Sequence, residues 1–214
     1  MAVTAKICGL NDPEAVAAAV AGGADQGGLV FYPPSPRYVT PATAAALAEG
    51  VPPGVSKVGL FVDASDDDLA AAFAEVDLDL VQLHGIESAD RVAAVAARFG
   101  VPVMKAIHVS HAADVAAADA YVEVADWLLF DARAPVGPDA LPGGNARAFD
   151  WRLLAERRWP LPWMLSGGLD ASNVAEAVRV SGARAVDISS GVEDRRGHKS
   201  PAKISAFLDA VQRL

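Results

Sequence analysis

The sequence predicts an α/β fold: a single-domain (β/α)8 TIM barrel, with eight parallel strands inside and helices outside. Short apolar runs alternate with Ala-rich amphipathic stretches along all 214 residues, and eight strand–helix units are typical of this barrel. No linker or change of composition divides the chain, which predicts one domain over residues 1–214. A doubly wound open sheet shows the same alternation, but eight units without a break favour the closed barrel.

The strands are predicted where short apolar runs end in glycine or polar residues. In chain order they cover residues 5–9, 27–32, 56–63, 79–85, 101–109, 126–132, 162–168 and 185–191.

The helices are predicted from apolar residues at helical spacing, and several begin at Ser or Asp and end at Gly, as capped helices do. They cover residues 12–23, 41–50, 66–76, 88–100, 110–124, 150–158, 170–182 and 200–214. The longest gap, 132–148, is rich in Gly, Pro and Ala and is expected to be a functional loop.

The composition excludes several classes of function. A net charge of −9 argues against nucleic-acid or anionic-membrane partners, which need clustered Lys and Arg. The single cysteine cannot form an internal disulfide or a Cys-rich metal site. The first residues resemble no signal peptide, and no apolar run is long enough to span a bilayer. We therefore expect a cytoplasmic protein.

The active site of such a barrel is expected at the C-terminal ends of its strands. Nearly every such position is polar or glycine: Cys8, Arg37, Asp63, His84, His108, Asp131, 166–168 and 189–191. No set of these residues has metal-ligand spacing, so the sequence predicts no metal. His108, His111 and His198 are interpreted as surface or loop residues.

Two of these positions have the character of phosphate loops. "LSGGLDASN" follows the seventh strand and "ISSGVED" follows the eighth. Glycine lets backbone N–H groups approach an anion closely, and barrels often bind phosphate at these two loops. The alternative is a pair of tight turns that need small residues.

Side-chain alternation places Lys6 and Cys8 on one face of the first strand. A buried lysine needs an anionic partner, and Asp187, on the neighbouring eighth strand, is the candidate. A nearby ammonium would lower the pKa of the thiol. Without further information, Cys8 is either catalytic or a small core residue.

The ordered motifs resemble those of the phosphoribosylanthranilate isomerase family of tryptophan biosynthesis, over essentially the full chain. They are "KICGL" (6–10), "GADQGGLVFYPPSPRYVT" (23–40), "VGLFVD" (58–63), "VQLHG" (81–85), "LLFDA" (128–132), "GGNARAFDW" (143–151), "LSGGLDASNV" (165–174) and "VDISSGVED" (186–194), followed by "KS" (199–200).

The resemblance implies a cofactor-free Amadori rearrangement of N-(5-phosphoribosyl)anthranilate, an aminoaldose, to an aminoketose. It implies that Cys8 is the general base, that Asp131 is the general acid and that Arg37 binds the anthranilate carboxylate. Lys6, His84 and Asp187 are expected to position the substrate. Phosphate binding is assigned to Gly143, Gly144, Gly167, Gly168, Ser189, Ser190 and Gly191. Other enzymes of the pathway are the candidate protein partners.

The chain departs from the family pattern in one loop: Gly143-Gly144 is followed by Asn145-Ala146, where the family reads Thr/Ser-Gly. Alanine takes positive φ less freely than glycine, so a changed loop geometry is expected. The alternative functions are a metal-dependent pentose-phosphate epimerase, an isomerase shared by the histidine and tryptophan pathways, and a catalytically silent regulator that binds phosphorylated ligands.

Overall fold

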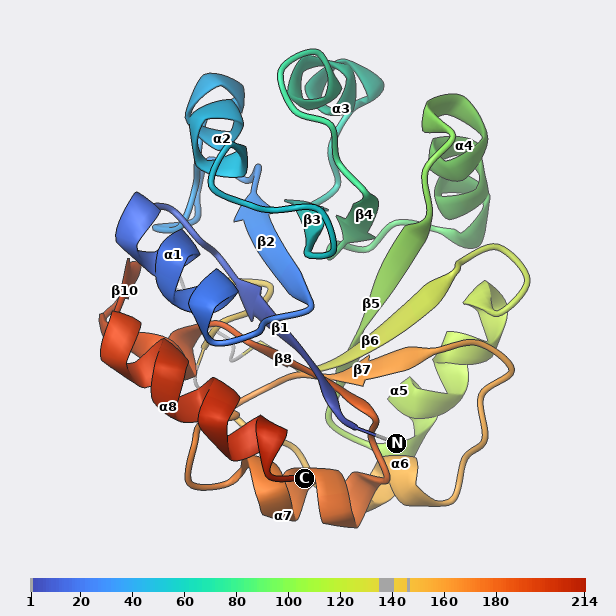
Figure 1. The fold of residues 1–214 in the computed structure, drawn as a ribbon. Coiled ribbons are helices and arrows are strands. Elements are labelled where there is room, and N and C mark those ends of the chain that lie inside the picture. The colour runs from blue at the N-terminus through green and yellow to red at the C-terminus, as the bar shows by residue number, and fades with distance from the viewer. Residues whose placement is uncertain (1, 135–140, 146) are drawn as a thin grey trace.

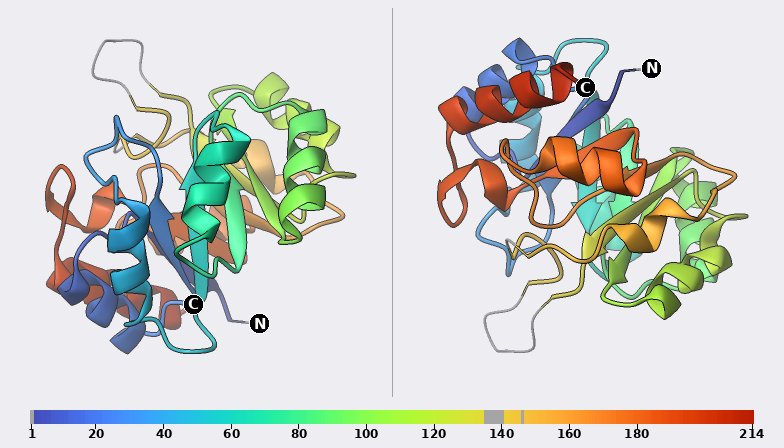
Figure 2. Two further views of the ribbon diagram at one scale, coloured as in Figure 1. Left: turned by 90° about the horizontal axis from the view of Figure 1, so that it is seen from above. Right: turned by 90° about the horizontal axis from the view of Figure 1, so that it is seen from below.

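The computed structural model, which describes residues 2–134, 141–145 and 147–214, confirms the predicted barrel. Eight parallel strands, β1 to β8, form a closed sheet in chain order, and β1 pairs with β8. Figure 1 shows the strands enclosed by the helices, and the views in Figure 2 show the two termini close together. Because consecutive parallel strands are neighbours, all eight C-terminal ends meet at one rim.

Each predicted strand is present. The strands are β1 (Thr4–Cys8), β2 (Gln26–Val30), β3 (Ser56–Phe61), β4 (Leu80–Leu83), β5 (Val103–Val109), β6 (Trp127–Ala132), β7 (Trp163–Leu165) and β8 (Ala185–Ile188).

Each predicted helix is present as well. The helices are α1 (Pro13–Ala21), α2 (Pro41–Ala48), α3 (Asp66–Phe73), α4 (Ala89–Phe99), α5 (Ala112–Ala117) with the 3-10 turn η1 (Ala118–Tyr121), α6 (Arg152–Ala155), α7 (Val174–Ser181) and α8 (Pro201–Gln212).

Local sequence signals set several helix boundaries. The Asp12 carboxylate accepts the Ala15 N–H at 2.8 Å and begins α1, which satisfies a backbone donor that a helix start leaves unpaired. Ser65 forms a capping box with Asp68 at the start of α3. Gly182, with φ of 75°, ends α7 in the left-handed conformation, where glycine is favoured.

The core has two layers. The larger layer lies between the strands and the helices and is built from the outward-facing strand residues. A smaller cluster fills the barrel interior: Val58, Leu80, Met104, Ala106, Leu129, Met164 and Ala185. Nearer the rim, the buried polar residues Lys6, Gln82 and Asp187 lie together with a small apolar cluster of Cys8, Val30 and Leu60. The interior cluster around Met104 therefore lies beneath the site.

Two features after β8 are absent from the predicted elements: the 3-10 turn η2 (Ser190–Val192), and a hairpin formed by β9 (Glu193–Arg195) and β10 (His198–Lys199). The sequence of the hairpin is polar and has no apolar alternation, so hydrophobic periodicity does not predict a strand there. The hairpin supplies two buried charged side chains to the site, Glu193 and Lys199. None of the described helices is long and apolar enough to cross a membrane.

Candidate active site

A pocket lies at the C-terminal rim of the barrel, where the sequence predicts the site. Its lining includes every predicted site residue except Lys6: Cys8, Arg37, His84, Asp131, Gly143, Gly144, Gly167, Gly168, Asp187, Ser189, Ser190 and Gly191. These residues come from seven separate segments of the chain, so closure of the barrel is what brings them together.

Lys6 and Asp187 form the buried ion pair that side-chain alternation predicts. Their Nζ and Oδ1 atoms are 2.8 Å apart, and the two residues are opposite each other in the β1–β8 register. The second carboxylate oxygen of Asp187 accepts the Ser166 hydroxyl at 2.9 Å. Burial disfavours the ammonium of Lys6, but Asp187 and Cys8 together outweigh burial and raise its pKa. Lys6 is therefore a fixed positive charge below the pocket floor.

Cys8 lies directly beside this charge. A Cβ atom added to Gly28 would be 3.1 Å from Cys8 Sγ and 3.3 Å from Lys6 Nζ. Both atoms therefore occupy the space beside Gly28 that a side chain would take. Burial nevertheless raises the pKa of the Cys8 thiol, although Lys6 opposes the increase. Lys6 lowers the pKa of the thiol, as expected from its charge, but desolvation of the thiolate exceeds the attraction of the ammonium.

The raised pKa predicts how the thiol titrates. The rate of Cys8 alkylation by iodoacetamide should increase with pH and reach half its maximum above about 8.5, the ordinary value for a thiol, because only the thiolate reacts. Cys8 is the only cysteine, so the mass of the intact protein reports this rate directly. A rate that levels off below pH 8 would contradict the expected direction.

Asp131 lies at the end of β6, lines the same pocket as Cys8 and is 4% exposed. Its Oδ1 accepts the Ala132 N–H at 2.9 Å, and its Oδ2 is 3.2 Å from His84 Nε2. The Gln82 amide nitrogen is 2.7 Å from His84 Nδ1. With the amide in this orientation, Gln82 donates to Nδ1, and the Nε2–H of His84 donates to Asp131. The chain Gln82–His84–Asp131 therefore fixes the direction of the carboxyl group.

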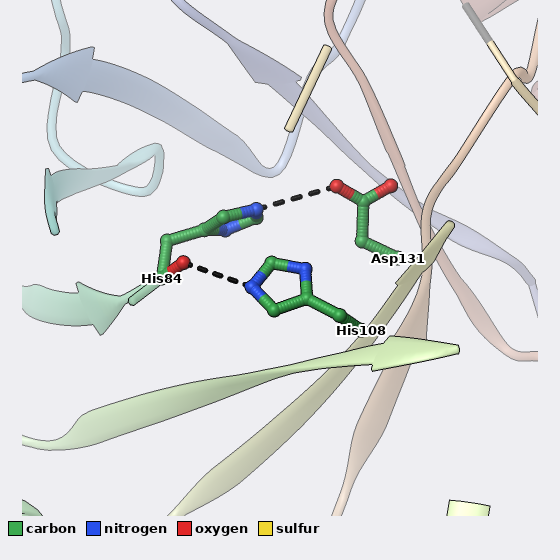
Figure 3. Close-up of side chains that lie close together, drawn as sticks. All are labelled: His84, His108 and Asp131. Atoms are coloured by element: carbon green, nitrogen blue, oxygen red, sulfur yellow. Dashed lines mark hydrogen bonds and ion pairs between the residues drawn. The ribbon is translucent and has the colours of Figure 1, made fainter. Parts of the chain in front are cut away.

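His108 is not the surface residue that the sequence indicated. It faces Asp131 in the β5–β6 register, and its Nε2 is 3.1 Å from the His84 carbonyl oxygen (Figure 3). Burial, and then the neighbouring His84, lower the pKa of His108 to about 4, so its ring is neutral at pH 7. His111 and His198 are exposed, as predicted.

The fold also brings together metal-ligating side chains that sequence spacing did not reveal. Ligand atoms of His84, His108 and Asp131 all lie within 4.8 Å of one another. They come from three adjacent strands, so no short motif contains more than one of them.

Arg37 is buried, with 3% of its surface exposed, and is not an ordinary surface arginine. It follows β2 and forms a bidentate ion pair with Glu193, with N···O distances of 2.6 and 2.9 Å. Burial disfavours the carboxylate of Glu193, but Arg37 and Lys199 outweigh it and lower its pKa to about 2. Glu193 therefore holds the guanidinium in place, a role that only the position of the hairpin reveals.

The two predicted phosphate loops lie side by side. Gly167 and Gly168 have φ of 91° and 65°, which glycine adopts at little cost, and their N–H groups donate to no acceptor among the residues that the structure describes. Gly191 packs so closely on the Leu169 carbonyl that a Cβ would overlap it. Lys199 donates to the Ser189 carbonyl at 2.9 Å, which adds a positive charge beside the second loop.

The described part of the loop after β6 covers a different side of the pocket. A Cβ on Gly143 would be 2.8 Å from Asp131 Oδ2, and one on Gly144 would be 2.5 Å from Arg37 Nη1. Gly143 therefore lies at the acid and Gly144 at the arginine. The Asn145 amide donates to the Leu141 carbonyl at 2.7 Å and so ties the loop to itself. Ala146 lies outside the described residues.

Comparison with known proteins identifies the family. The family profile described as N-(5′-phosphoribosyl)anthranilate (PRA) isomerase matches residues 5–210. The chain belongs to the N-(5′-phosphoribosyl)anthranilate isomerase family. The isomerase of Rhodospirillum centenum is 61% identical over 214 residues and covers 100% of both chains. That of Paramagnetospirillum magneticum is 56% identical over 212 residues, which is 99% of this chain and 98% of the relative.

Solved structures of this isomerase family have the same fold. The Thermotoga maritima enzyme is 36% identical, with a TM-score of 0.88 over 99% of this chain and 100% of the other. A phosphoribosylanthranilate isomerase in complex with reduced 1-(o-carboxyphenylamino)-1-deoxyribulose 5-phosphate is 35% identical, with a TM-score of 0.85 and the same coverage. The resemblance read from the motifs is confirmed: the chain is an aldose–ketose isomerase of tryptophan biosynthesis.

Proposed function

We propose that this chain converts N-(5-phosphoribosyl)anthranilate into 1-(2-carboxyphenylamino)-1-deoxyribulose 5-phosphate with Asp131 as general acid and Cys8 as general base. The observation that carries the proposal is that both groups line one pocket together with Arg37 and the two glycine loops. A guanidinium matches a carboxylate and the loops suit a phosphate. A substrate with one anion at each end would place its sugar between Cys8 and Asp131.

The first proton transfer opens the ribose ring. The Asp131 carboxyl gives its proton to the ring oxygen, the bond from this oxygen to C1′ breaks, and the nitrogen lone pair forms a protonated Schiff base. His84, whose Nε2 is 3.2 Å from Asp131 Oδ2, keeps the carboxyl directed into the pocket. Gly143 lies against both side chains and limits access of water to the acid.

The second proton transfer forms the enolamine. The Cys8 thiolate takes the proton from C2′, the electron pair forms the C1′–C2′ double bond, and the nitrogen becomes neutral. The enolamine then gains a proton at C1′ and loses one from the C2′ hydroxyl, which gives the ketone. Asp131 has lost one proton and Cys8 has gained one, so exchange with water restores both groups. Lys6 favours the thiolate electrostatically.

The assignment of Arg37 predicts a defect in binding. Arg37→Ala should raise KM about tenfold or more, because a hydrogen bond to a charged group contributes about 1.5–3 kcal/mol. The effect on kcat should be smaller, since the carboxylate is bound equally in ground and transition states. Arg152→Ala, which removes an exposed arginine paired with Asp150, is the matched control. An unchanged KM in a folded Arg37→Ala variant would remove this assignment.

The assignment of the glycine loops predicts that inorganic phosphate binds the free enzyme. Phosphate should inhibit competitively, and it should raise the melting temperature because it binds only the folded state. Chloride at equal ionic strength is the control for a general salt effect. If saturating phosphate neither inhibits nor stabilises, the two loops do not form the phosphate site.

The overall proposal is tested by incubating the purified chain with phosphoribosylanthranilate and following the loss of the substrate's anthranilate fluorescence. The expected result is turnover by wild type after chelator treatment, and none by Cys8→Ala. A metal-dependent epimerase or a silent ligand-binding regulator would leave the fluorescence unchanged.

Two further expectations accompany the function. The mechanism uses Cys8 as a free thiol, which supports a reducing compartment such as the cytoplasm. Association with other enzymes of the tryptophan pathway stays a prediction.

A further inference from the structure

Three possible metal-ligand groups lie close together at the pocket, where His84 and Asp131 belong to its lining and His108 lies next to them. His84 follows β4, His108 lies on β5 and Asp131 lies on β6, and Figure 3 shows their side chains directed toward one another. His84 Nε2 and Asp131 Oδ2 are 3.2 Å apart, and ligand atoms of all three residues lie within 4.8 Å of one another. Two imidazoles and one carboxylate on adjacent strands are a common ligand set for divalent transition metals.

His108 presents a free lone pair to this cluster. Its Nε2 is 3.1 Å from the His84 carbonyl oxygen, which can only accept, so Nε2 carries the hydrogen and Nδ1 is the acceptor nitrogen. Nδ1 is buried and has no hydrogen-bond partner within the described residues, and Figure 3 shows it on the side of Asp131. A buried polar atom without a partner needs an explanation, and a bound cation supplies one.

Gln82 provides the outer support that a metal-binding histidine needs. Its amide is 2.7 Å from His84 Nδ1, and its Oε1 is buried without a partner in the part of the chain that the structure describes. When the Gln82 amide rotates by 180°, its Oε1 accepts a hydrogen bond from His84 Nδ1–H. The Nε2 atom of His84 then has a lone pair for the metal. Metal-binding histidines usually donate their second N–H in this way. His108 already does so, toward the His84 carbonyl.

We propose that His84, His108 and Asp131 bind a divalent transition-metal ion such as Zn²⁺. Ligand bonds of about 2.0–2.1 Å in a tetrahedral site place ligand atoms about 3.4 Å apart. The His84–Asp131 pair already has this separation, and His108 needs to approach by no more than about 1.5 Å. Mg²⁺ and Ca²⁺ prefer oxygen ligands, so two nitrogens disfavour them. The remaining coordination position faces the pocket.

The ion would inhibit the enzyme. Coordination holds the Asp131 carboxylate and prevents it from carrying a proton to the substrate. This inhibition, though not the binding itself, rests on the proposed role of Asp131.

Isothermal titration of the chelator-treated protein with ZnCl₂ tests the site. Wild type should bind one ion per chain. His108→Ala and His108→Gln should each weaken binding by at least about tenfold, because loss of even an outer-shell partner costs about 10–100-fold. His198→Ala, which removes an exposed histidine of the hairpin, should bind as wild type does. Bound Co²⁺ should show d–d absorption without the charge-transfer band of a cobalt–thiolate bond.

The proposal is overturned if wild type binds no Zn²⁺, or if both folded His108 variants bind as tightly as wild type. A thiolate–cobalt band, or loss of binding in Cys8→Ala, would place the ion at the cysteine and also overturn it. In the activity assay Zn²⁺ should inhibit, EDTA should restore turnover, and His108→Ala should tolerate at least tenfold more Zn²⁺. Tight Zn²⁺ binding without inhibition would confirm the metal site and count against Asp131 as the acid.

Discussion

Cys8→Ala should lower kcat by about 10²–10⁴-fold, the usual contribution of a general base, and the barrel should remain folded. The thiol lies at the rim beside Lys6 and belongs to a small apolar cluster with Val30 and Leu60, with Tyr32 and Val62 at the edge. Loss of one small side chain there should cost about 1 kcal/mol, the typical effect of a single substitution. Steady-state kinetics and a thermal melt on the same preparation separate the two effects.

A second measurement checks that the thiol itself is responsible. Iodoacetamide should inactivate the wild type, and a product analogue should protect it. Cys8→Ser keeps the shape but replaces the thiol by a much weaker acid, so it should be nearly as impaired as Cys8→Ala. Near-normal turnover by Cys8→Ala would make the thiol a small core residue only.

Asp131→Asn should lower kcat by at least about 10²-fold, with KM close to that of wild type. The amide keeps the shape of the carboxyl and its contact with His84, but it has no proton to give to the ring oxygen. A change that affects kcat and not KM is typical of an interaction made in the transition state. Steady-state kinetics, with circular dichroism to confirm folding, measure this.

Asp119→Asn is the matched control for this variant. Asp119 is an exposed carboxylate paired with Arg157 on the surface, and its loss should leave kcat within about twofold of wild type. If folded Asp131→Asn retains more than about a tenth of the wild-type kcat, the carboxyl is only a hydrogen-bond acceptor for His84 and the Ala132 N–H.

The barrel could be predicted from the sequence because each strand–helix unit carries its own pattern. Strand boundaries are predicted less accurately where a functional loop follows directly. The apolar run predicts one strand over 162–168, but β7 ends at Leu165. The positive φ of Gly167 and Gly168 turns the backbone away from the sheet to form the loop.

Part of the site could also be predicted from local rules. Alternation on β1 and closure of the barrel place Lys6 against Asp187, and the structure has that pair. Glu193 and His108 could not be found in this way. Glu193 acts through Arg37, 156 positions away in the chain, and His108 acts through its contact with His84, which follows β4. Local patterns contain no information on such long-range packing.

The assignment of Asp131 as general acid and Cys8 as general base can be tested most directly by trapping the open-chain Schiff base. Each variant is mixed with phosphoribosylanthranilate and sodium cyanoborodeuteride, and the reduced products are analysed by mass spectrometry. Deuterium at C1′ reports reduction of the Schiff base, whereas deuterium at C2′ reports reduction of the finished ketone. Cys8→Ala retains the acid, so it should form the C1′-labelled product faster than the uncatalysed mixture does, and Asp131→Asn should not. Acceleration by Asp131→Asn alone, or by neither variant, would contradict the assignment of the acid step to Asp131 and the base step to Cys8.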